Sequence, residues 1–296
     1  MNPNKVSDTI PIGRIETITG KAVVDYRAVQ GGYTPAKRLV VTLSDGSTLF
    51  AKIATNELTA GWLRQEKFVY DSLAAPFMPQ FQGWDDDGEQ PMLLLEDLSH
   101  AFWPPPWDDG RIDQVVDALA CVARCRGPDL PRLVNYRGLT DGWQRVVSDP
   151  APFLSLGLAS EAWLNQALAT LLDINYGSYL DGAELVHLDI RSDNLCFDGD
   201  RVVIIDWNWA CFGNARLDIG AWLPSLETEG GPPPEHLLPD AGEIAAIISG
   251  YHAANAGLPA VPGAPRLRLA QLTQLKSALP WTVRALDLPP LDGMDM

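Results

Sequence analysis

The sequence predicts an α+β protein in which a small, β-rich N-terminal lobe precedes a larger, mainly helical C-terminal lobe. Three observations lead to this prediction. Short apolar runs separated by turn residues fill most of the first hundred positions, the proline-rich stretch Trp103–Trp107 interrupts the chain, and helical periodicity dominates after it. We therefore expect an N-terminal lobe over residues 1–98 and a C-terminal lobe over residues 99–296.

The β-rich lobe should contain an antiparallel hairpin. Leu39–Leu43 and Thr48–Ile53 are apolar runs on either side of an Asp-Gly dipeptide at residues 45–46, and Asp-Gly is a strong signal for a tight turn. The other expected elements are a helix over Glu57–Leu73, a strand over Met92–Leu95, and four later helices over Ile112–Cys125, Ser160–Leu172, Ala241–Ala256 and Leu267–Leu279.

Composition excludes several classes of protein. The 296 residues are 46% apolar and 20% charged, as in ordinary globular proteins. No run of about 18 apolar residues predicts a membrane span, and the N-terminus lacks the profile of a secretory signal, so we expect a cytoplasmic protein. A net charge of −16 argues against a nucleic-acid partner. It suits a cationic small molecule, although acidity that only keeps the protein soluble is the alternative.

A lysine and a glutamate in the first lobe each need a partner. Lys52 lies within a predicted strand, and Glu66, fourteen residues later, falls in the apolar stripe of the next helix. Burial of an unpaired charge is costly, so an ion pair between them is expected, with the ammonium directed at the phosphates of a nucleotide. The alternative is that Lys52 extends to solvent and Glu66 lies at the edge of the stripe.

Two glycines precede this lysine. Gly31 and Gly32 lie between β-like stretches upstream of Lys52. Glycines allow backbone amides to approach phosphates closely, although a Gly-Gly pair is also common in plain turns.

The segment from residue 187 to residue 209 contains the strongest signal. Asp189 and Asn194 lie in a polar stretch before an expected β-hairpin, and Asp206 follows the second strand of that hairpin. Phosphoryl transfer needs a carboxylate to orient the acceptor hydroxyl, and Mg²⁺ needs hard oxygen ligands. Asp189 suits the first role, and Asn194 and Asp206 suit the second. Asp and Asn also cap turns and helices, but three such caps at this spacing are a poorer explanation.

Taken together, these residues resemble the aminoglycoside phosphotransferase family, which consists of small-molecule kinases with a protein-kinase-like fold. The resemblance covers about residues 15–256, and its most specific part is His187–Trp209, where His187-Leu188-Asp189 through Asn194 and Ile205-Asp206-Trp207 stand. It implies the two-lobed fold, use of ATP and Mg²⁺, and transfer of the γ-phosphate to a small-molecule hydroxyl.

The resemblance also implies roles for individual residues. Asp189 would be the catalytic base, Asn194 and Asp206 would hold Mg²⁺, and Asp218 would be a structural aspartate. The residues implied for nucleotide binding are Lys52 and Glu66 as a pair, Gly31, Gly32, Tyr33 and Thr34 in a loop, and the backbone of Glu96 and Leu98 at the hinge between the lobes.

Two departures from the family pattern stand out in the loop. Leu188 replaces a usual glycine, so we expect this loop to be held differently or its neighbours to be reshaped. Arg191 lies two residues after Asp189, where it is assigned a catalytic contact with the γ-phosphate; a surface arginine is the alternative.

Asp206-Trp207-Asn208 lacks the glycine of the protein-kinase motif, which favours a small-molecule acceptor over a protein.

The acceptor expected from these features is an antibiotic or a related natural product, with a sugar, amino-alcohol or nucleoside metabolite as the alternative. Glu227, Glu229 and Asp240 could meet a cationic acceptor, and Trp207, Trp209 and Trp222 could stack on one, although solvated charges and buried core are the ordinary roles of such residues. A non-catalytic nucleotide-binding module and a protein kinase are the competing functions. Either a monomer or a homodimer is compatible with the sequence.

Overall fold

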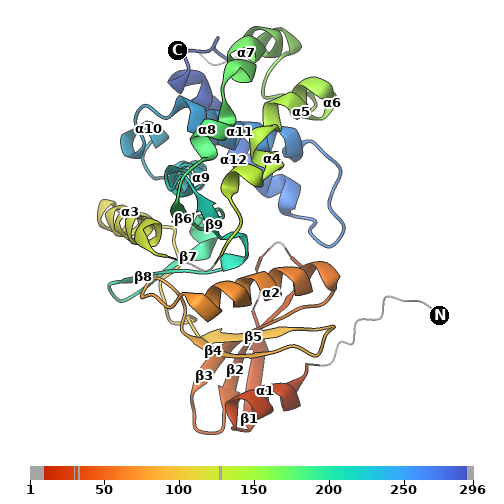
Figure 1. Cartoon of the computed structure of the whole chain (residues 1–296), viewed down its shortest axis with the longest axis vertical. Helices are drawn as coiled ribbons and strands as arrows, with labels where there is room; N and C mark the ends of the chain where they lie inside the picture. Colours follow the sequence, from red (N-terminus) through yellow and green to blue (C-terminus); the bar gives the residue numbers. More distant parts are fainter. Residues whose placement is uncertain (1–9, 30, 33, 127–128, 292–296) are drawn as a thin grey trace, which may run out of the picture. The chain divides into compact units, whose positions relative to one another are not determined.

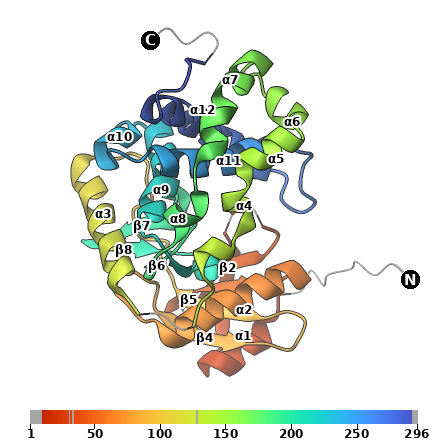
Figure 2. The same ribbon diagram turned by 45° about the horizontal axis from the view of Figure 1, so that its top comes forward.

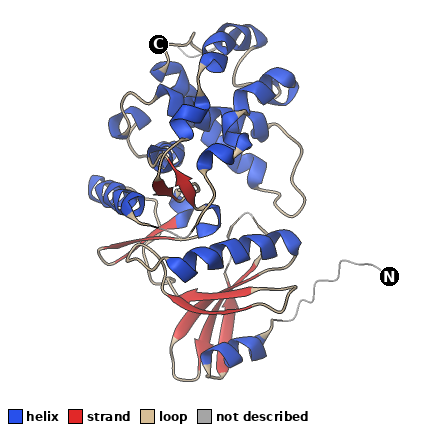
Figure 3. Cartoon of the chain, viewed as in Figure 1, coloured by secondary structure: helices blue, strands red, loops and turns tan. Residues whose placement is uncertain are grey.

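The computed structural model describes residues 10–29, 31–32, 34–126 and 129–291, which fall into two compact units. The first unit contains the chain up to Trp103 together with Cys196–Trp209, and the second contains Pro104–Leu195 and the chain from Ala210 onward. Figure 3 shows that strands dominate the first unit and helices the second, which confirms the predicted α+β class. The return of residues 196–209 to the first unit was not expected from the sequence, and the lobes at residues 1–98 and 99–296 stay a prediction.

An antiparallel sheet of five strands forms the first unit, in the order β1-β2-β3-β5-β4. Its strands are β1 (Val23–Ala28), β2 (Lys37–Leu43), β3 (Thr48–Ile53), β4 (Phe81–Asp85) and β5 (Met92–Glu96). The predicted hairpin is confirmed as β2–β3, with Val40 opposite Phe50 and with Gly46 at φ +83° in its turn. A positive φ favours glycine because it has no Cβ.

Helices α1 (Ile12–Thr19) and α2 (Glu57–Ser72) pack on opposite faces of this sheet (Figures 1 and 2). Ile15 of α1 joins an apolar cluster with the strand residues of one face, which include Ala51 and Ile53. Because side chains alternate along a strand, Lys52 lies on the opposite face, towards α2. Helix α2 begins where the sequence predicts, because Asn56 accepts a hydrogen bond from the amide of Thr59 at 2.9 Å.

A hairpin leads to the last segment of the first unit. It consists of β7 (Leu195–Asp198) and β8 (Arg201–Ile204), with Gly199 at φ +60° between them, and a 3₁₀ turn over Trp207–Trp209 follows. Leu98, Cys196 and Val203 form a small apolar core, and the amide of Ile204 donates to the carbonyl of Phe77 at 2.8 Å. The hairpin is therefore anchored to the sheet region, and it fixes the position of Asp206.

The second unit is mainly helical, with a two-stranded sheet whose first strand directly precedes residues 187–194. The helices are α3 (Asp109–Arg124), α4 (Arg137–Thr140), α5 (Gly142–Ser148), α6 (Ala151–Leu154), α7 (Glu161–Asp173), α8 (Tyr176–Leu180), α9 (Arg216–Thr228), α10 (Pro234–Leu237), α11 (Gly242–Ala256) and α12 (Leu267–Ala285), with 3₁₀ turns over Leu133–Asn135 and Ser192–Asn194. Strands β6 (Glu184–Val186) and β9 (Cys211–Gly213) form the small sheet.

Helix α11 lies at the centre of the second unit. It packs against α12, α5 and α9, and Gly250 allows its backbone to touch Trp143, since a Cβ there would lie 2.7 Å from the indole. Helix α12 continues to Ala285, past the predicted end at Leu279 and through Pro280. Its buried side chains on both sides of the proline, such as Leu275 and Trp281, show that packing outweighs the local cost of a helical proline. Within the described part of the chain, no helix combines the length and apolarity that crossing a bilayer requires.

Candidate active site

Three charged side chains gather in the first unit around Lys52. Its ammonium lies 2.7 Å from Oε2 of Glu66 on α2 and also donates to Oδ1 of Asp206, which follows β8. The side chains of Lys52 and Glu66 are 11% and 1% exposed, and that of Asp206 is 30% exposed. The pairing of Lys52 with Glu66 is as the sequence predicts. The contact of Lys52 with Asp206, 154 residues away, was not predicted from the sequence.

One ammonium shared by two carboxylates leaves this cluster with a net negative charge. Burial opposes the charge of Lys52, but the carboxylates of Asp206 and Glu66 outweigh it and raise the pKa of the lysine. Burial also raises the pKa of Glu66, the nearby Asp206 carboxylate adds to this, and Lys52 offsets only part of it. A further cation next to Asp206 would therefore be electrostatically favourable.

The glycine pair upstream of Lys52 adopts backbone conformations that only glycine adopts easily. Gly31 has φ +131° and Gly32 has φ +73°. The guanidinium of Arg38 lies against Gly32, where a Cβ would approach it to 2.6 Å, and it donates to Oγ1 of Thr34 at 2.8 Å. Of the predicted nucleotide loop, Tyr33 lies outside the described residues.

Arg38 is a candidate binding-site residue that was not predicted from the sequence. It lies directly opposite Lys52 in the β2–β3 pairing, so the two cations share one face of the sheet. The register of the predicted hairpin, with its turn at residues 45–46, could have placed it there. While Lys52 turns to the carboxylates, Arg38 turns to the glycine-bearing loop, through donations to the carbonyls of Thr34 and Ala36 at 3.2 Å and 2.9 Å.

The predicted hinge residues close the sheet at the end of β5. The amide of Glu96 donates to the carbonyl of Gln80 at 2.9 Å, and its carboxylate accepts from Arg201. The carbonyl of Leu98 accepts from the amide of Ala101 and from the indole of Trp103. The role of Glu96 and Leu98 in binding adenine stays a prediction.

In the second unit, Asp189 lies in the loop between β6 and β7 and is held by its neighbours. Its Oδ1 accepts from Nη1 of Arg191 at 2.7 Å, and its Oδ2 accepts from the amide nitrogen of Asn194 at 3.1 Å. The same nitrogen donates to the carbonyl of Asp189 at 2.8 Å. Arg191 also contacts Asp193, with 2.9 Å between Nε and Oδ1. The structure thus brings Asp189, Arg191 and Asn194 together in one network.

The backbone before Asp189 is fixed by a buried aspartate. Asp218, on α9, is 2% exposed and accepts the amides of His187 and Leu188, both at 2.8 Å. Burial raises the pKa of Asp218 to about 7, although these two hydrogen bonds lower it. The imidazole of His187 is also buried, and its Nδ1 accepts from the amide of Asp189 at 3.3 Å.

Leu188 has φ +68°, a left-handed conformation that is unusual for a leucine. This explains why a glycine would be the expected residue here. The loop keeps the left-handed turn despite the larger side chain, and Asp218 holds it by the amide of Leu188 itself. Asp206 also has a positive φ, of +73°, but aspartate tolerates this region better than leucine does.

The residues considered for acceptor binding differ in their burial and in their hydrogen-bond partners. Glu227 accepts from Ser277, and Glu229 accepts from the indole of Trp107 at 2.8 Å, so both are engaged within the second unit. Trp207 and Trp222 are fully buried and belong to the core, whereas Trp209 is partly exposed. Tyr251 on α11, which no sequence signal indicated, is close enough to Asp189 for that carboxylate to contribute to its raised pKa, after burial as the main cause.

The oxygens of Asn194 and Asp206 have the chemistry that Mg²⁺ prefers. The carbonyl and the carboxylate of Asp189 are both acceptors, so the amide nitrogen of Asn194 must face Asp189 and its oxygen must face away from it. Among the described residues, no three His, Cys, Asp or Glu side chains gather as a metal site. Mg²⁺ does not require such a group, because it is commonly bound by one or two protein ligands together with phosphates. The side-chain oxygens of Asp206 in the first unit and of Asn194 in the second each fit this ion.

The fold is that of the protein-kinase-like phosphotransferases. A family model described as the phosphotransferase enzyme family matches residues 25–254, and the chain belongs to this family. The resemblance to the aminoglycoside phosphotransferases and the expectation of a small-molecule kinase are thereby confirmed. None of the curated proteins matches the sequence.

Solved structures share the fold at low sequence identity. A choline/ethanolamine kinase family protein from Mesorhizobium loti is 14% identical, with 89% of this chain and 91% of that chain covered and a TM-score of 0.55. A macrolide 2'-phosphotransferase from Brachybacterium faecium is 14% identical, with 93% and 91% covered and a TM-score of 0.51. An amicoumacin kinase in complex with AMP-PNP and Ca²⁺ is 12% identical, with 89% and 90% covered and a TM-score of 0.50. At these identities the comparisons show the fold.

Proposed function

We propose that the protein transfers the γ-phosphate of ATP, with Mg²⁺, to a hydroxyl group of an antibiotic or a related natural product. The observation that carries the proposal is the buried Lys52 cluster. A lysine that pairs with a helix carboxylate and with the aspartate after a hairpin is the arrangement that phosphoryl-transfer enzymes of this fold use to position nucleotide phosphates.

Each charged group has a proposed role. Lys52, oriented by Glu66, contacts the α- and β-phosphates, and the loop with Gly31, Gly32 and Thr34 covers them. Asn194 and Asp206 hold Mg²⁺, which neutralises charge on the phosphates when it is bound. Arg191, which now contacts Asp189, would contact the γ-phosphate.

Asp189 is the proposed base and positioning group for the acceptor hydroxyl. It accepts the proton of that hydroxyl while the oxygen attacks phosphorus, and the bond from phosphorus to the leaving oxygen of ADP breaks in line. The hydrogen bonds from Arg191 and Asn194 fix the rotamer of Asp189. A direct transfer of this kind inverts the configuration of a chiral γ-phosphate, so retention would overturn it.

The choice of acceptor class has two supports. The chain carries a net charge of −16, which favours the approach of cations. Two proteins that share the fold are named for antibiotic substrates, a macrolide phosphotransferase and an amicoumacin kinase, and a third is a choline/ethanolamine kinase family protein. Kinases of amino-alcohols or sugars are therefore the second class to test.

The test is a screen of antibiotics and hydroxylated metabolites for phosphorylation that depends on MgATP. Asp189→Asn should reduce kcat by about 10²–10⁴-fold, because the general base is lost, while MgATP binding by calorimetry persists. Asp200→Asn, which changes an exposed carboxylate in the turn of the hairpin after the loop, is the matched control and should retain activity. If the wild type binds MgATP but phosphorylates no acceptor in a broad panel, a non-catalytic binding module is the better description; if it phosphorylates generic proteins, it is a protein kinase.

A further inference from the structure

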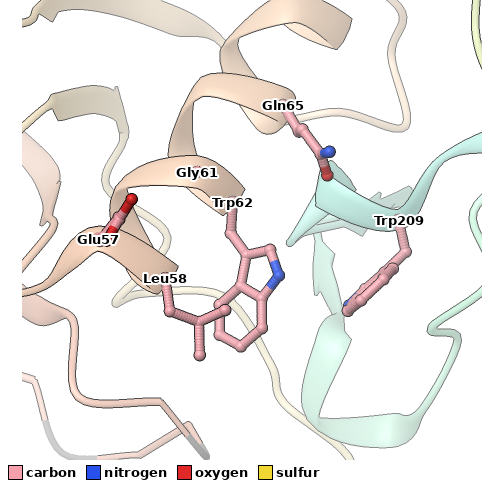
Figure 4. Close-up of a pocket in the computed structure, with 6 residues that line it drawn as sticks. All are labelled: Glu57, Leu58, Gly61, Trp62, Gln65 and Trp209. Carbon is pink, nitrogen blue, oxygen red and sulfur yellow. The ribbon is translucent and has the colours of Figure 1, made fainter.

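The first unit contains an open cavity of about 480 Å³ beside α2 that has no role in the function described so far. Six residues line it, five from α2 and its first turns and one from the 3₁₀ turn after Asp206: Glu57, Leu58, Gly61, Trp62, Gln65 and Trp209. Figure 4 shows the indoles of Trp62 and Trp209 on opposite sides of the space between these two elements. Its volume falls within the range of small-molecule sites.

The two aromatic walls are tied to the Lys52 cluster. Trp62 precedes Glu66 by one helical turn on α2, and Trp209 follows Asp206 by three residues. Glu66 and Asp206 are the two carboxylates that hold Lys52. A ligand in the cavity would therefore lie about one helical turn from the groups proposed to bind the nucleotide, within the same unit.

The indoles form an angled pair instead of a stack. Their centroids are 6.1 Å apart and their planes are inclined by 54°, and both residues are partly exposed. The face of a tryptophan ring attracts cations more strongly than that of any other side chain. Glu57 adds a carboxylate, and no lysine, arginine or histidine is among the six lining residues. The lining thus favours an organic cation and disfavours an anion.

The floor of the cavity is a helical glycine that packing does not explain. A Cβ at Gly61 would meet no atom within 4 Å, in contrast to Gly250, where one would collide with Trp143. Glycine within a helix is less favourable than alanine. Because Gly61 lines the cavity, a side chain at this position would occupy part of it, and the glycine keeps the cavity open.

We propose that this cavity binds a protonated amine attached to an apolar ring or chain. The inference goes beyond the proposed function, because it assigns to the first unit a ligand site of its own. Trp62 and Trp209 contact the ammonium and its apolar substituent, Leu58 extends the apolar surface, and Glu57 balances the charge.

The first test measures binding to the whole protein with three probes of similar shape: 2-phenylethylamine, 2-phenylethanol and 3-phenylpropionate. By calorimetry or saturation-transfer NMR, the amine should bind about 3- to 10-fold more tightly than the alcohol, a gain typical of cation–π contacts, and the carboxylate should bind most weakly. Glu57→Gln should reduce the preference for the amine. Equal binding of the three probes would overturn the proposal.

The second test fills the cavity without removing a contact. Gly61→Leu adds a side chain where space is open and raises helix propensity, so the variant should remain folded, as its thermal melt will show. It should abolish binding of the amine, as should Trp62→Ala. Phe68→Ala, which removes an exposed aromatic ring from the same helix outside the cavity, should bind the amine as the wild type does. Undiminished binding to Gly61→Leu would overturn the proposal.

The third test separates this inference from the proposed function. Because all residues that line the cavity belong to the first unit, Asp189→Asn should bind 2-phenylethylamine as the wild type does. If the wild type phosphorylates acceptors but binds 2-phenylethylamine no more tightly than 2-phenylethanol, the inference fails and the function stands. If the wild type phosphorylates no acceptor, yet binds 2-phenylethylamine and loses this binding in Gly61→Leu, the function fails and the inference stands.

Discussion

The Lys52 cluster and the Asp189 loop contain the same kinds of group but are held in different ways. The cluster joins residues 14 and 154 positions apart, and its lysine and glutamate are nearly inaccessible. In the loop, Arg191 and Asp189 are two positions apart and about a quarter exposed. Burial makes pairing obligatory in the cluster. In the loop, the ion pair adds little, and the backbone must supply the geometry through Asp218 and the turn at Leu188.

The largest expected difference between the two regions concerns the loss of a cation. Lys52→Met leaves two buried or half-buried carboxylates without their partner, and it should lower the free energy of unfolding at pH 7 by about 3–5 kcal/mol. Arg191→Met breaks a partly exposed pair and should cost only about 0–1 kcal/mol. Urea denaturation of the two variants beside the wild type provides the measurement. Similar losses in both variants would show that burial does not separate the two regions.

This contrast also shows what the sequence could predict. A lysine in a strand and a glutamate in an apolar stripe are local patterns that demand a partner, so the pair of Lys52 with Glu66 was predictable. The contact of Lys52 with Asp206 was not, because it depends on how the hairpin over residues 195–204 returns to the first unit. Periodicity says nothing about such long-range packing.

In the loop, the sequence indicated which residues matter but not how they are held. The spacing of Asp189 and Asn194 predicted a shared role, and the structure brings them into one network. The φ of Leu188 could not be derived, because propensity argues against a left-handed leucine. Asp218 was expected to be structural, but only the fold shows that it binds two consecutive amides. The angled pair of Trp62 and Trp209 likewise needs tertiary structure.

An effect of intermediate size is expected from Asp218, which should make the stability of the protein depend on pH. Its pKa of about 7 in the folded chain lies above that of an aspartate in an unfolded chain. Between about pH 4 and pH 7 the folded protein therefore keeps a proton that the unfolded chain releases. This contribution to stability is fully present below pH 4, decreases by up to about 1.4 kcal/mol per pH unit, and is lost above pH 7.

The comparison with Asp218→Asn isolates this effect, because all other titrating groups are shared. Unfolding curves at pH 5, 6, 7 and 8 should show that the advantage of the wild type over the variant shrinks up to about pH 7 and is then constant. Asparagine cannot accept both amides, so a constant penalty of about 1–3 kcal/mol should remain where the carboxylate is ionised. A wild-type advantage that is constant across the whole range would contradict the raised pKa.

The smallest expected effect tests whether the turn at Leu188 stores strain that the Lys52 cluster lacks. Leu188→Ala and Leu188→Gly both remove the side chain, but only glycine relieves a φ of +68°. The glycine variant should therefore be more stable than the alanine variant by about 1 kcal/mol. Gly61, which lies within α2 and has space around its Cβ, is the matched site: there, Gly61→Ala should stabilise the protein by about 0.5–1 kcal/mol. If glycine is the more stable residue at position 188 and alanine the more stable residue at position 61, the strain lies in the Asp189 loop. If alanine is more stable than glycine at both positions, Asp218 and the surrounding packing impose no left-handed turn on residue 188 in solution.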